Sequence, residues 1–294
     1  MSATRFAVMA LCLTVLAQAA SAERESPRMR NPFFAMDTCT KAHYPASDVL
    51  SPDAQLDLLK ELGYAGIAWT AGDPAQTRAV VLGCKKRGMK LFAHYVGATL
   101  RRDALEFPPT TLQELDALAG AHAVVWVHIG SPDYARSSPE GDATAVDALR
   151  RFADEAAARG LRVALYPHVG DWTERVQDCV RVAEKVGRPN LGVTFNLCHC
   201  LQVGDETRIP ELLAQAAPRL FVVTINGADA GAAGASWNRL IQTLDRGTYD
   251  IGIVLRKLRE LRYTGPIGLQ GFGIGGDIRD NLARSMAAWR KRAD

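Results

Sequence analysis

Side chains that could move protons recur where short β-rich runs of the sequence end. Four of the six histidines stand at or just after such ends: His94, His128, His168 and His199. Imidazole exchanges protons near neutral pH, so each is a candidate for general acid–base catalysis. A lone histidine of this kind is as readily a hydrogen-bonded core residue, but four on successive strands favour a shared site.

Hydrogen-bonding residues accompany these histidines at equivalent strand positions. Side chains two residues apart on a strand share one face, which places Tyr166 beside His168. Asn196, Asn226 and Gln270 occupy the corresponding face of later strands. An amide both donates and accepts hydrogen bonds, which suits sugar hydroxyl groups or the oxygen of a developing enolate. We therefore expect these five side chains to point together into one pocket.

The chemistry of these residues predicts a division of roles. His168 and His199 would carry the proton, and Tyr166 would act as a weak acid. Trp69 and Trp172 could offer ring faces to a pyranose, although tryptophans are more often packing residues. The predicted substrate-binding set is Asn196, Asn226, Gln270, His94, His128, Trp69 and Trp172.

The elements that carry these residues repeat along the chain. A helix with apolar residues at helical spacing reaches a glycine or proline, and a short β-rich run follows. The stretches "LLKELGYAGIAW" (58–69) and "AAARGLRVALYPH" (156–168) are two examples. Gly63 and Gly160 stand where a helix commonly ends in a left-handed residue. The strands are predicted near residues 32–37, 65–69, 90–95, 123–129, 162–167, 191–196, 220–226 and 266–271.

This alternation predicts the fold. Strands that alternate with helices require parallel strands joined by right-handed crossovers. Eight such units in about 270 residues indicate the α/β class and a single (β/α)8 TIM barrel over residues 23–294. A doubly wound open sheet is the alternative, but no Gly-rich G-x-G-x-x-G turn follows the first strand.

The first 22 residues are predicted to be a signal peptide and not part of the barrel. Arg5 precedes an apolar run, and Ala20-Ser21-Ala22 forms an A-x-A cleavage signal before Glu23. The run is too short for a comfortable membrane span. We therefore expect an exported protein, periplasmic or secreted, with no membrane segment after cleavage.

Composition narrows the possible partners. A net charge of +3 on 294 residues gives no electrostatic footprint for nucleic acid. The cysteines that follow the predicted cleavage site are scattered and odd in number, which favours buried free thiols over a disulfide framework. One bridged pair stays possible among Cys39, Cys84, Cys179, Cys198 and Cys200.

Over residues 31–292, the spacing of the strands and the sequences at their ends resemble those of the xylose-isomerase-like TIM-barrel superfamily, the sugar (phosphate) isomerase/epimerase group. That family typically carries Glu on the fifth strand, Asp-x-x-His after the sixth, His on the seventh and Glu on the eighth, and these groups hold a divalent metal. The corresponding positions here are Tyr166, Asn196 with His199, Thr224 and Gln270. Only His199 matches.

The replaced metal-ligand positions do not decide whether the protein binds a metal cofactor. An amide oxygen can ligate a metal but adds no charge, so neutral ligands alone bind a divalent cation weakly unless several imidazoles join. His168 and His199 are the candidate ligands, and no H-x-H or H-E-x-x-H spacing forces their convergence. A divalent metal is therefore possible but not predicted.

Three functions remain open at this point. The first is an exported isomerase, epimerase or related keto-sugar lyase that abstracts a proton next to a carbonyl of an uncharged carbohydrate. The second is a carbohydrate-binding barrel that has lost the metal site and the chemistry. The third is a metal-dependent endonuclease of the same fold, which the unexceptional charge and the altered ligand positions disfavour. A small-molecule carbohydrate is the expected partner.

Overall fold

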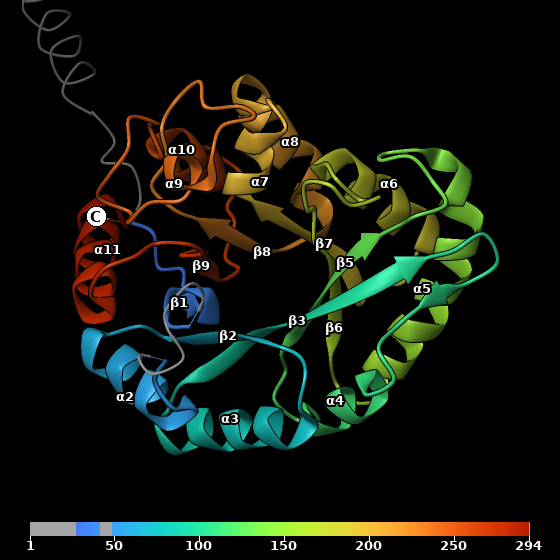
Figure 1. Cartoon of the computed structure of the whole chain (residues 1–294), viewed down its shortest axis with the longest axis horizontal. Helices are drawn as coiled ribbons and strands as arrows, with labels where there is room; N and C mark the ends of the chain where they lie inside the picture. Colours follow the sequence, from blue (N-terminus) through green and yellow to red (C-terminus); the bar gives the residue numbers. More distant parts are fainter. Residues whose placement is uncertain (1–27, 42–48, 294) are drawn as a thin grey trace, which may run out of the picture.

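Parallel strands close into a barrel surrounded by helices (Figure 1). The computed structural model describes residues 28–41 and 49–293, so the predicted signal peptide lies outside the described residues. The parallel strands are β1 (Phe33–Met36), β2 (Gly66–Thr70), β3 (Lys90–Leu100), β5 (Val124–Gly130), β6 (Arg162–Leu165), β7 (Leu191–Asn196), β8 (Leu220–Ile225) and β9 (Ile267–Leu269). β1 pairs with both β2 and β9, which closes the barrel. The predicted (β/α)8 barrel is thereby confirmed, and the open sheet is excluded.

One strand was not anticipated from the sequence. β4 (Leu105–Glu106) pairs antiparallel with the end of β3, so β3 and β4 form a hairpin beyond the barrel rim. Leu100 pairs with Leu105 and Thr99 with Glu106. This hairpin forms one side of a groove next to the candidate site.

Helices cover the outside of the barrel, as Figure 1 shows. They are α2 (Pro52–Leu62), α3 (Pro74–Lys86), α4 (Thr111–Ala117), α5 (Asp142–Ala157), α6 (Val176–Val186), α8 (Ile209–Ala216), α10 (Gly252–Glu260) and α11 (Ile278–Ala293). Two short helices, α7 (Leu197–Gln202) and α9 (Trp237–Leu240), lie in the segments that follow β7 and β8. Sequence signals set their ends: Ser51 caps α2 before Pro52, and Gly63 ends that helix with φ of 89°. Short 3-10 turns are η1 (Asp37–Cys39), η2 (Pro139–Gly141), η3 (Glu206–Arg208) and η4 (Ala217–Arg219).

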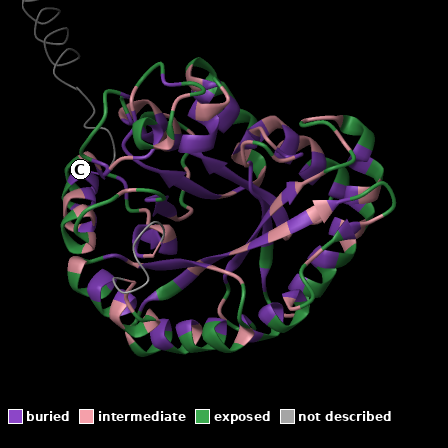
Figure 2. Ribbon diagram, in the orientation of Figure 1, coloured by how far each residue is buried: buried purple, intermediate pink, exposed green. Residues whose placement is uncertain are grey.

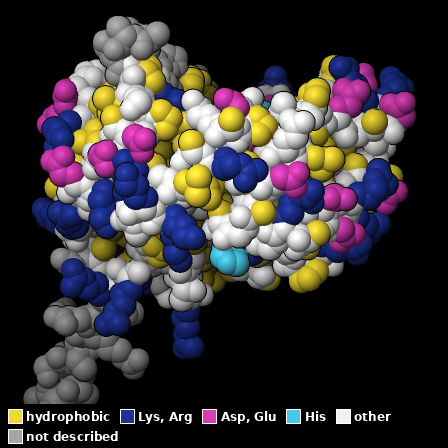
Figure 3. Space-filling model, turned by 90° about the horizontal axis from the view of Figure 1, so that it is seen from below, with side chains coloured by type: hydrophobic (Ala, Val, Ile, Leu, Met, Phe, Trp, Pro, Cys, Tyr) yellow, Lys and Arg dark blue, Asp and Glu magenta, His cyan; other side chains and the backbone are white. Residues whose placement is uncertain are grey.

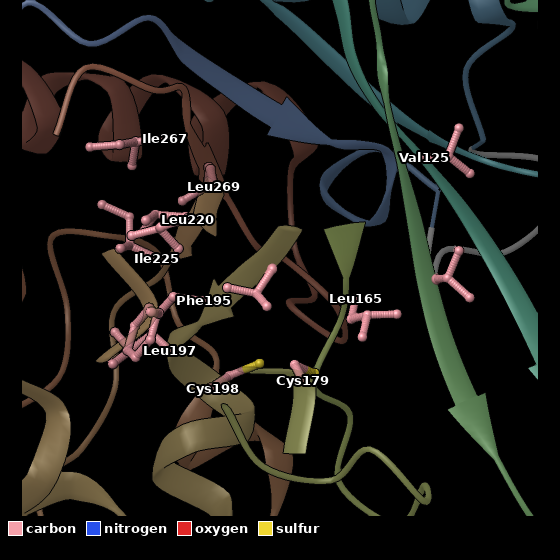
Figure 4. Packing of buried hydrophobic residues seen from close by; sticks show 14 of the residues in the cluster. Val125, Leu165, Cys179, Phe195, Leu197, Cys198, Leu220, Ile225, Ile267 and Leu269 are labelled. Atoms are coloured by element: carbon pink, nitrogen blue, oxygen red, sulfur yellow. The ribbon is translucent and has the colours of Figure 1, made fainter. Parts of the chain in front are cut away.

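Hydrophobic side chains form two layers, one outside and one inside the sheet. The outer layer joins strands to helices, and Figure 4 labels Leu165, Phe195 and Ile225 within it. The inner layer fills the barrel with large rings, including those of Phe34 and Trp126. Figure 2 shows buried strands and helices that are exposed on their outer side. Because rings fill the barrel, any ligand must bind at its mouth.

An irregularity in β3 changes which side chains of that strand face inward. Leu91 pairs with Ile67 but Ala93 pairs with Ala68, so Phe92 is an extra residue in the register. Ala93 and Tyr95 pack in the inner layer, whereas His94 is buried on the opposite face. Its Nε2 lies 3.2 Å from Oε2 of Glu114, in α4. His94 therefore faces the helices and not the barrel interior, away from the other predicted site residues.

Three further predictions concern the state of the cysteine thiols, the distribution of charge on the surface and the presence of membrane-spanning helices. All five cysteines after the predicted signal peptide are buried and free, as the sequence favoured. Basic and acidic side chains are interspersed over much of the face in Figure 3. Within residues 28–41 and 49–293, no helix has the length and apolar character needed to cross a membrane.

Candidate active site

A cavity of about 310 Å³ opens at the carboxyl ends of the strands. This is the end at which the βα-loops of such barrels build their sites. Four of the predicted residues line it: Tyr166, His168, His199 and Gln270. The other lining residues are Met36, Thr38, Thr70, Tyr95, Cys198, Trp237, Ile241 and Phe272. The lining contains no Asp, Glu, Lys or Arg, so the cavity suits an uncharged ligand.

The two predicted proton carriers lie against each other, and both contact the backbone of Val169. The ring centroids of His168 and His199 are 4.3 Å apart. His168 Nδ1 lies 3.0 Å from the carbonyl oxygen of Val169, which can only accept, so Nδ1 carries the hydrogen. Val169 N–H donates to His199 Nδ1 at 3.4 Å, which leaves the hydrogen of that ring on Nε2. The pair thus combines a free acceptor, His168 Nε2, with a donor, His199 Nε2–H.

Burial keeps both imidazoles neutral. Burial lowers the pKa of His199 well below its usual range, and the neighbouring His168 and His128 lower it further. Burial also lowers the pKa of His168, while the charge of Asp171 acts in the opposite direction. A neutral imidazole is the form that can accept a proton, so His168 is poised as a general base near neutral pH.

Tyr166 rises from the barrel interior to the floor of the cavity. Its pKa lies well above the usual range because the phenol is fully buried, although hydrogen bonds to Gln270 and Asn196 oppose the shift. Asn196 Nδ2 donates to the phenol oxygen, which leaves the phenolic hydrogen for another acceptor. Tyr166 therefore serves as a neutral hydrogen-bond donor.

Asn196 positions its neighbours and does not line the cavity. It is fully buried and caps α7, where its Oδ1 accepts from the backbone N–H of His199 at 3.4 Å. The same oxygen accepts from the Cys198 thiol at 3.0 Å. One amide thus holds both Tyr166 and the helix that carries His199. Asn196, predicted to bind substrate, thus lies behind the cavity lining and supports it.

Three further residues predicted to bind substrate lie outside the cavity lining. Asn226 is fully buried, and its Nδ2 donates to the carbonyl oxygens of Gly227 at 2.8 Å and Leu240 at 2.7 Å. Trp172 is buried and donates its indole N–H to the carbonyl oxygen of Ser138. Trp69 is buried in the outer hydrophobic layer. Asn226, Trp172 and Trp69 therefore support loops and packing and do not line the cavity.

His128 lies beside the cavity and not in it. It faces inward from β5, stacks on Tyr95 with centroids 4.7 Å apart, and lines a neighbouring groove of about 480 Å³. Its Nδ1 lies 2.7 Å from Oδ2 of Asp171, whose Oδ1 lies 3.8 Å from Nδ1 of His168. Asp171 therefore connects the two histidines, and its spacing three residues after His168 is the signal that could have identified it.

The sequence analysis also missed residues that the loops bring to the cavity. Thr38 donates to Oε1 of Gln270 at 2.5 Å, which fixes the amide at the rim. Trp237 meets the His199 ring edge-on, with centroids 5.5 Å apart. Phe272 follows β9 and is partly exposed. Trp237 begins the one-turn helix α9 and Phe272 follows β9, both in segments without periodic patterning, so only the folded chain identifies them.

The architecture of the barrel agrees with the comparison to protein families. A family model described as a xylose isomerase-like TIM barrel matches residues 56–292. The chain belongs to this family. No curated protein matches the sequence. The earlier resemblance over residues 31–292 is confirmed at the level of the family.

Solved structures of xylose isomerase-like barrels share the fold. A D-allulose 3-epimerase from Methylomonas sp. in complex with D-allulose has a TM-score of 0.68 at 16% identity, covering 90% of this chain and 98% of its own. A 3-keto-D-glucoside 4-epimerase from E. coli has a TM-score of 0.68 at 17% identity, covering 89% and 100%. The IOLI protein with a binding zinc atom has a TM-score of 0.68 at 15% identity, covering 89% and 98%. At these identities the similarity establishes the fold alone.

The metal that the xylose isomerase-like family implies does not fit the residues of this cavity. Oε1 of Gln270 already accepts from Thr38 and from the backbone N–H groups of Gly271 at 2.9 Å and Phe272 at 3.1 Å. The side-chain oxygen of Asn196 likewise already accepts hydrogen bonds from Cys198 and His199. Of the positions that hold the metal in the family, only His199 therefore keeps the family's residue. Throughout the described ranges, no group of three or more His, Cys, Asp or Glu side chains is placed to hold a metal ion.

The neutral state of His199 predicts how stability depends on pH. Its pKa is lowered in the folded state, so below about pH 6.5 the unfolded chain binds a proton that the folded protein excludes. We expect the unfolding free energy to be constant above about pH 7 and to fall by about 1 kcal/mol per pH unit below 6.5. Urea denaturation at pH 7.5, 6.5 and 5.5 measures this, and His199→Gln should flatten the decline. An unchanged decline in that variant would refute the assignment.

Proposed function

We propose that this xylose isomerase-like barrel is a sugar isomerase or epimerase, or a related keto-sugar lyase, acting on an uncharged carbohydrate. The observation that carries the proposal is the complementary pair of neutral imidazoles in a cavity lined without charged side chains. Such a cavity binds a neutral polyol through hydrogen bonds and does not favour a sugar phosphate. Sugar epimerases among the structures of the same fold agree with this proposal.

The proposed step is proton abstraction next to a carbonyl. The lone pair on His168 Nε2 takes the proton from the carbon, and the C–H electron pair moves into the new carbon–carbon double bond of an enolate. His199 Nε2–H and the Tyr166 hydroxyl donate hydrogen bonds to the enolate oxygen as its charge develops. For an epimer, the enolate turns within the cavity so that its opposite face meets the His168 imidazolium, which then returns the proton to the same carbon. For an isomer, the hydroxyl proton of the deprotonated carbon passes to the enolate oxygen, and the imidazolium delivers its proton to the former carbonyl carbon.

A second candidate is a carbohydrate-binding barrel without catalysis. The observation that favours it is the loss of the family's metal-ligand set at Tyr166, Asn196 and Gln270. Both functions would use the same cavity. We also propose export of the protein, because residues 1–22 have the pattern of a signal peptide.

Isotope exchange separates the two candidates. The protein, produced from residue 23, is incubated in D₂O with D-fructose, D-allulose, D-tagatose and 3-keto-glucosides, and the sugars are examined by NMR. We expect solvent deuterium at a carbon next to the carbonyl of at least one sugar, together with its epimer, isomer or elimination product. Sugar binding without exchange or product across the panel would favour the binding barrel.

Asp171 should set the pH at which the base works. Its charge raises the pKa of His168 against the effect of burial, so Asp171→Asn removes that contribution. We expect the acid limb of the kcat/KM profile to move to lower pH, because His168 then stays neutral further into the acid range. Rates measured from pH 4.5 to 8 check this shift. Glu140→Gln, at an exposed position, is the control and should leave the profile unchanged.

A further inference from the structure

A second hollow adjoins the cavity at the barrel mouth. It is the groove of about 480 Å³ between the β3–β4 hairpin and the end of β5. His128 and Asp171 form its inner side, and Thr99, Glu106 and Phe107 belong to the hairpin side. The proposed reaction uses none of these side chains as proton donor or acceptor.

The groove and the cavity have one wall in common. Tyr95 lines the cavity, His128 lines the groove, and their rings stack at 4.7 Å with an interplanar angle of 7°. The His168 ring, on the cavity side, lies 5.4 Å from the His128 ring. The rings of His128 and His168 form a crest between the two hollows. Their side chains are 26% and 34% exposed, so this crest is open to solvent. A ligand held at His168 can therefore extend over this crest into the groove.

The local backbone positions His128 for contact with a ligand in the groove. A Cβ atom at Gly97 would come within 2.8 Å of His128 Nε2, so only glycine lets the ring lie against β3. Asp171 holds Nδ1 of the same ring at 2.7 Å. The ring orientation is thus fixed from both sides, with its edge at the groove.

The two hollows differ in chemistry. Carboxylates, an imidazole and a hydroxyl group line the groove, from Asp171, Glu106, His128 and Thr99. An anion placed there would meet two carboxylates, whereas hydroxyl groups of a neutral ligand could hydrogen-bond to the carboxylate, imidazole and hydroxyl groups of the lining. Phe107 adds an apolar surface at the same place. Hydrogen-bonding groups beside an apolar surface suit a neutral sugar ring, which has hydroxyl edges and C–H faces.

We propose that the groove at His128 binds a second sugar unit, so that the substrate is a disaccharide or another glycoside whose reacting unit lies in the cavity. This inference rests on the proposed function, because it takes the cavity as the place of the reacting sugar. The glycosidic oxygen would lie above the crest formed by His128 and His168. The second unit supplies binding and does not react.

Filling the groove tests the proposal. Thr99 pairs across the sheet with Gly130, whose missing side chain leaves room for a larger neighbour. Thr99→Phe should therefore occupy the groove, and Thr99→Ser is the matched control that keeps both the hydroxyl and the space. Calorimetry measures binding of isomaltulose, maltulose and D-fructose to each variant, and thermal melting confirms folding.

We expect the disaccharides to bind the unmodified protein at least about tenfold more tightly than D-fructose. Thr99→Phe should remove this advantage and leave D-fructose binding unchanged, while Thr99→Ser retains the advantage. His128→Phe, which preserves the ring stack on Tyr95, should also remove it. Equal affinity for the disaccharides and D-fructose, with normal deuterium exchange, would overturn this inference alone. Absence of binding and exchange with every sugar would overturn the proposed function as well.

Discussion

Replacing His168 by Asn should reduce turnover by about 10²- to 10⁴-fold, the usual contribution of a positioned general base. The Asn amide can still donate to the carbonyl oxygen of Val169, as Nδ1 of the imidazole does at 3.0 Å. It has no group that takes the place of Nε2, so the variant keeps the local hydrogen bond and loses the base. Deuterium incorporation at matched sugar concentrations measures the loss.

The same substitution at His122 provides the control for His168→Asn. His122 is exposed and has φ of 54°, a backbone conformation that Asn tolerates well. His122→Asn should leave exchange unchanged, and sugar affinity should change little in either variant. Full exchange activity in His168→Asn would show that another group takes the proton.

Replacing Glu114 by Ala should lower the unfolding free energy by about 3 kcal/mol. Glu114 and His94 are both fully buried, and Oε1 of Glu114 also accepts from the backbone N–H of Gly72 at 2.9 Å. Burial acts to raise the pKa of Glu114, but hydrogen bonds from neighbours such as His94 and Gly72 lower it overall, so the carboxylate stays charged. Its loss leaves the backbone N–H of Gly72 without its acceptor and removes the carboxylate that faces the buried His94 ring.

Urea denaturation measures the effect of Glu114→Ala. The exposed ion pair of Glu61 with Arg279 supplies the control, and Glu61→Ala should change stability little. Exchange activity per folded molecule should stay unchanged in Glu114→Ala, since His94 faces away from the cavity. If Glu114→Ala lost activity but kept its stability, this result would show that His94 contributes to the active site.

The alternation of strands and helices made the barrel predictable from sequence, whereas side-chain direction was predictable only where strands are regular. On β6 and its extension, Tyr166 and His168 share a face as the period of two requires, and both line the cavity. On β3 the extra residue Phe92 reverses the phase, so Tyr95 faces inward in place of His94. No local pattern in the sequence marks that irregularity.

Hydrogen bonding between neighbours also separates residues that look equivalent in sequence. Asn196, Asn226 and Gln270 occupy the same strand position, yet only Gln270 lines the cavity. Asn196 accepts from the backbone of α7, and Asn226 donates to the carbonyl oxygen of Leu240, the last residue of α9. Such contacts depend on the shape of the segment that follows each strand, so the sequence could not distinguish a binding amide from a supporting one.

The most direct test is deuterium exchange by protein that has been dialysed against EDTA. We expect exchange into a neutral keto-sugar to persist after chelation, to be insensitive to added Mn²⁺, Mg²⁺ or Zn²⁺, and to be lost in His168→Asn. That result would assign the proton transfer to the neutral imidazole pair. Exchange that disappears with chelation and returns with a divalent cation would contradict the assignment, as would exchange that survives in His168→Asn.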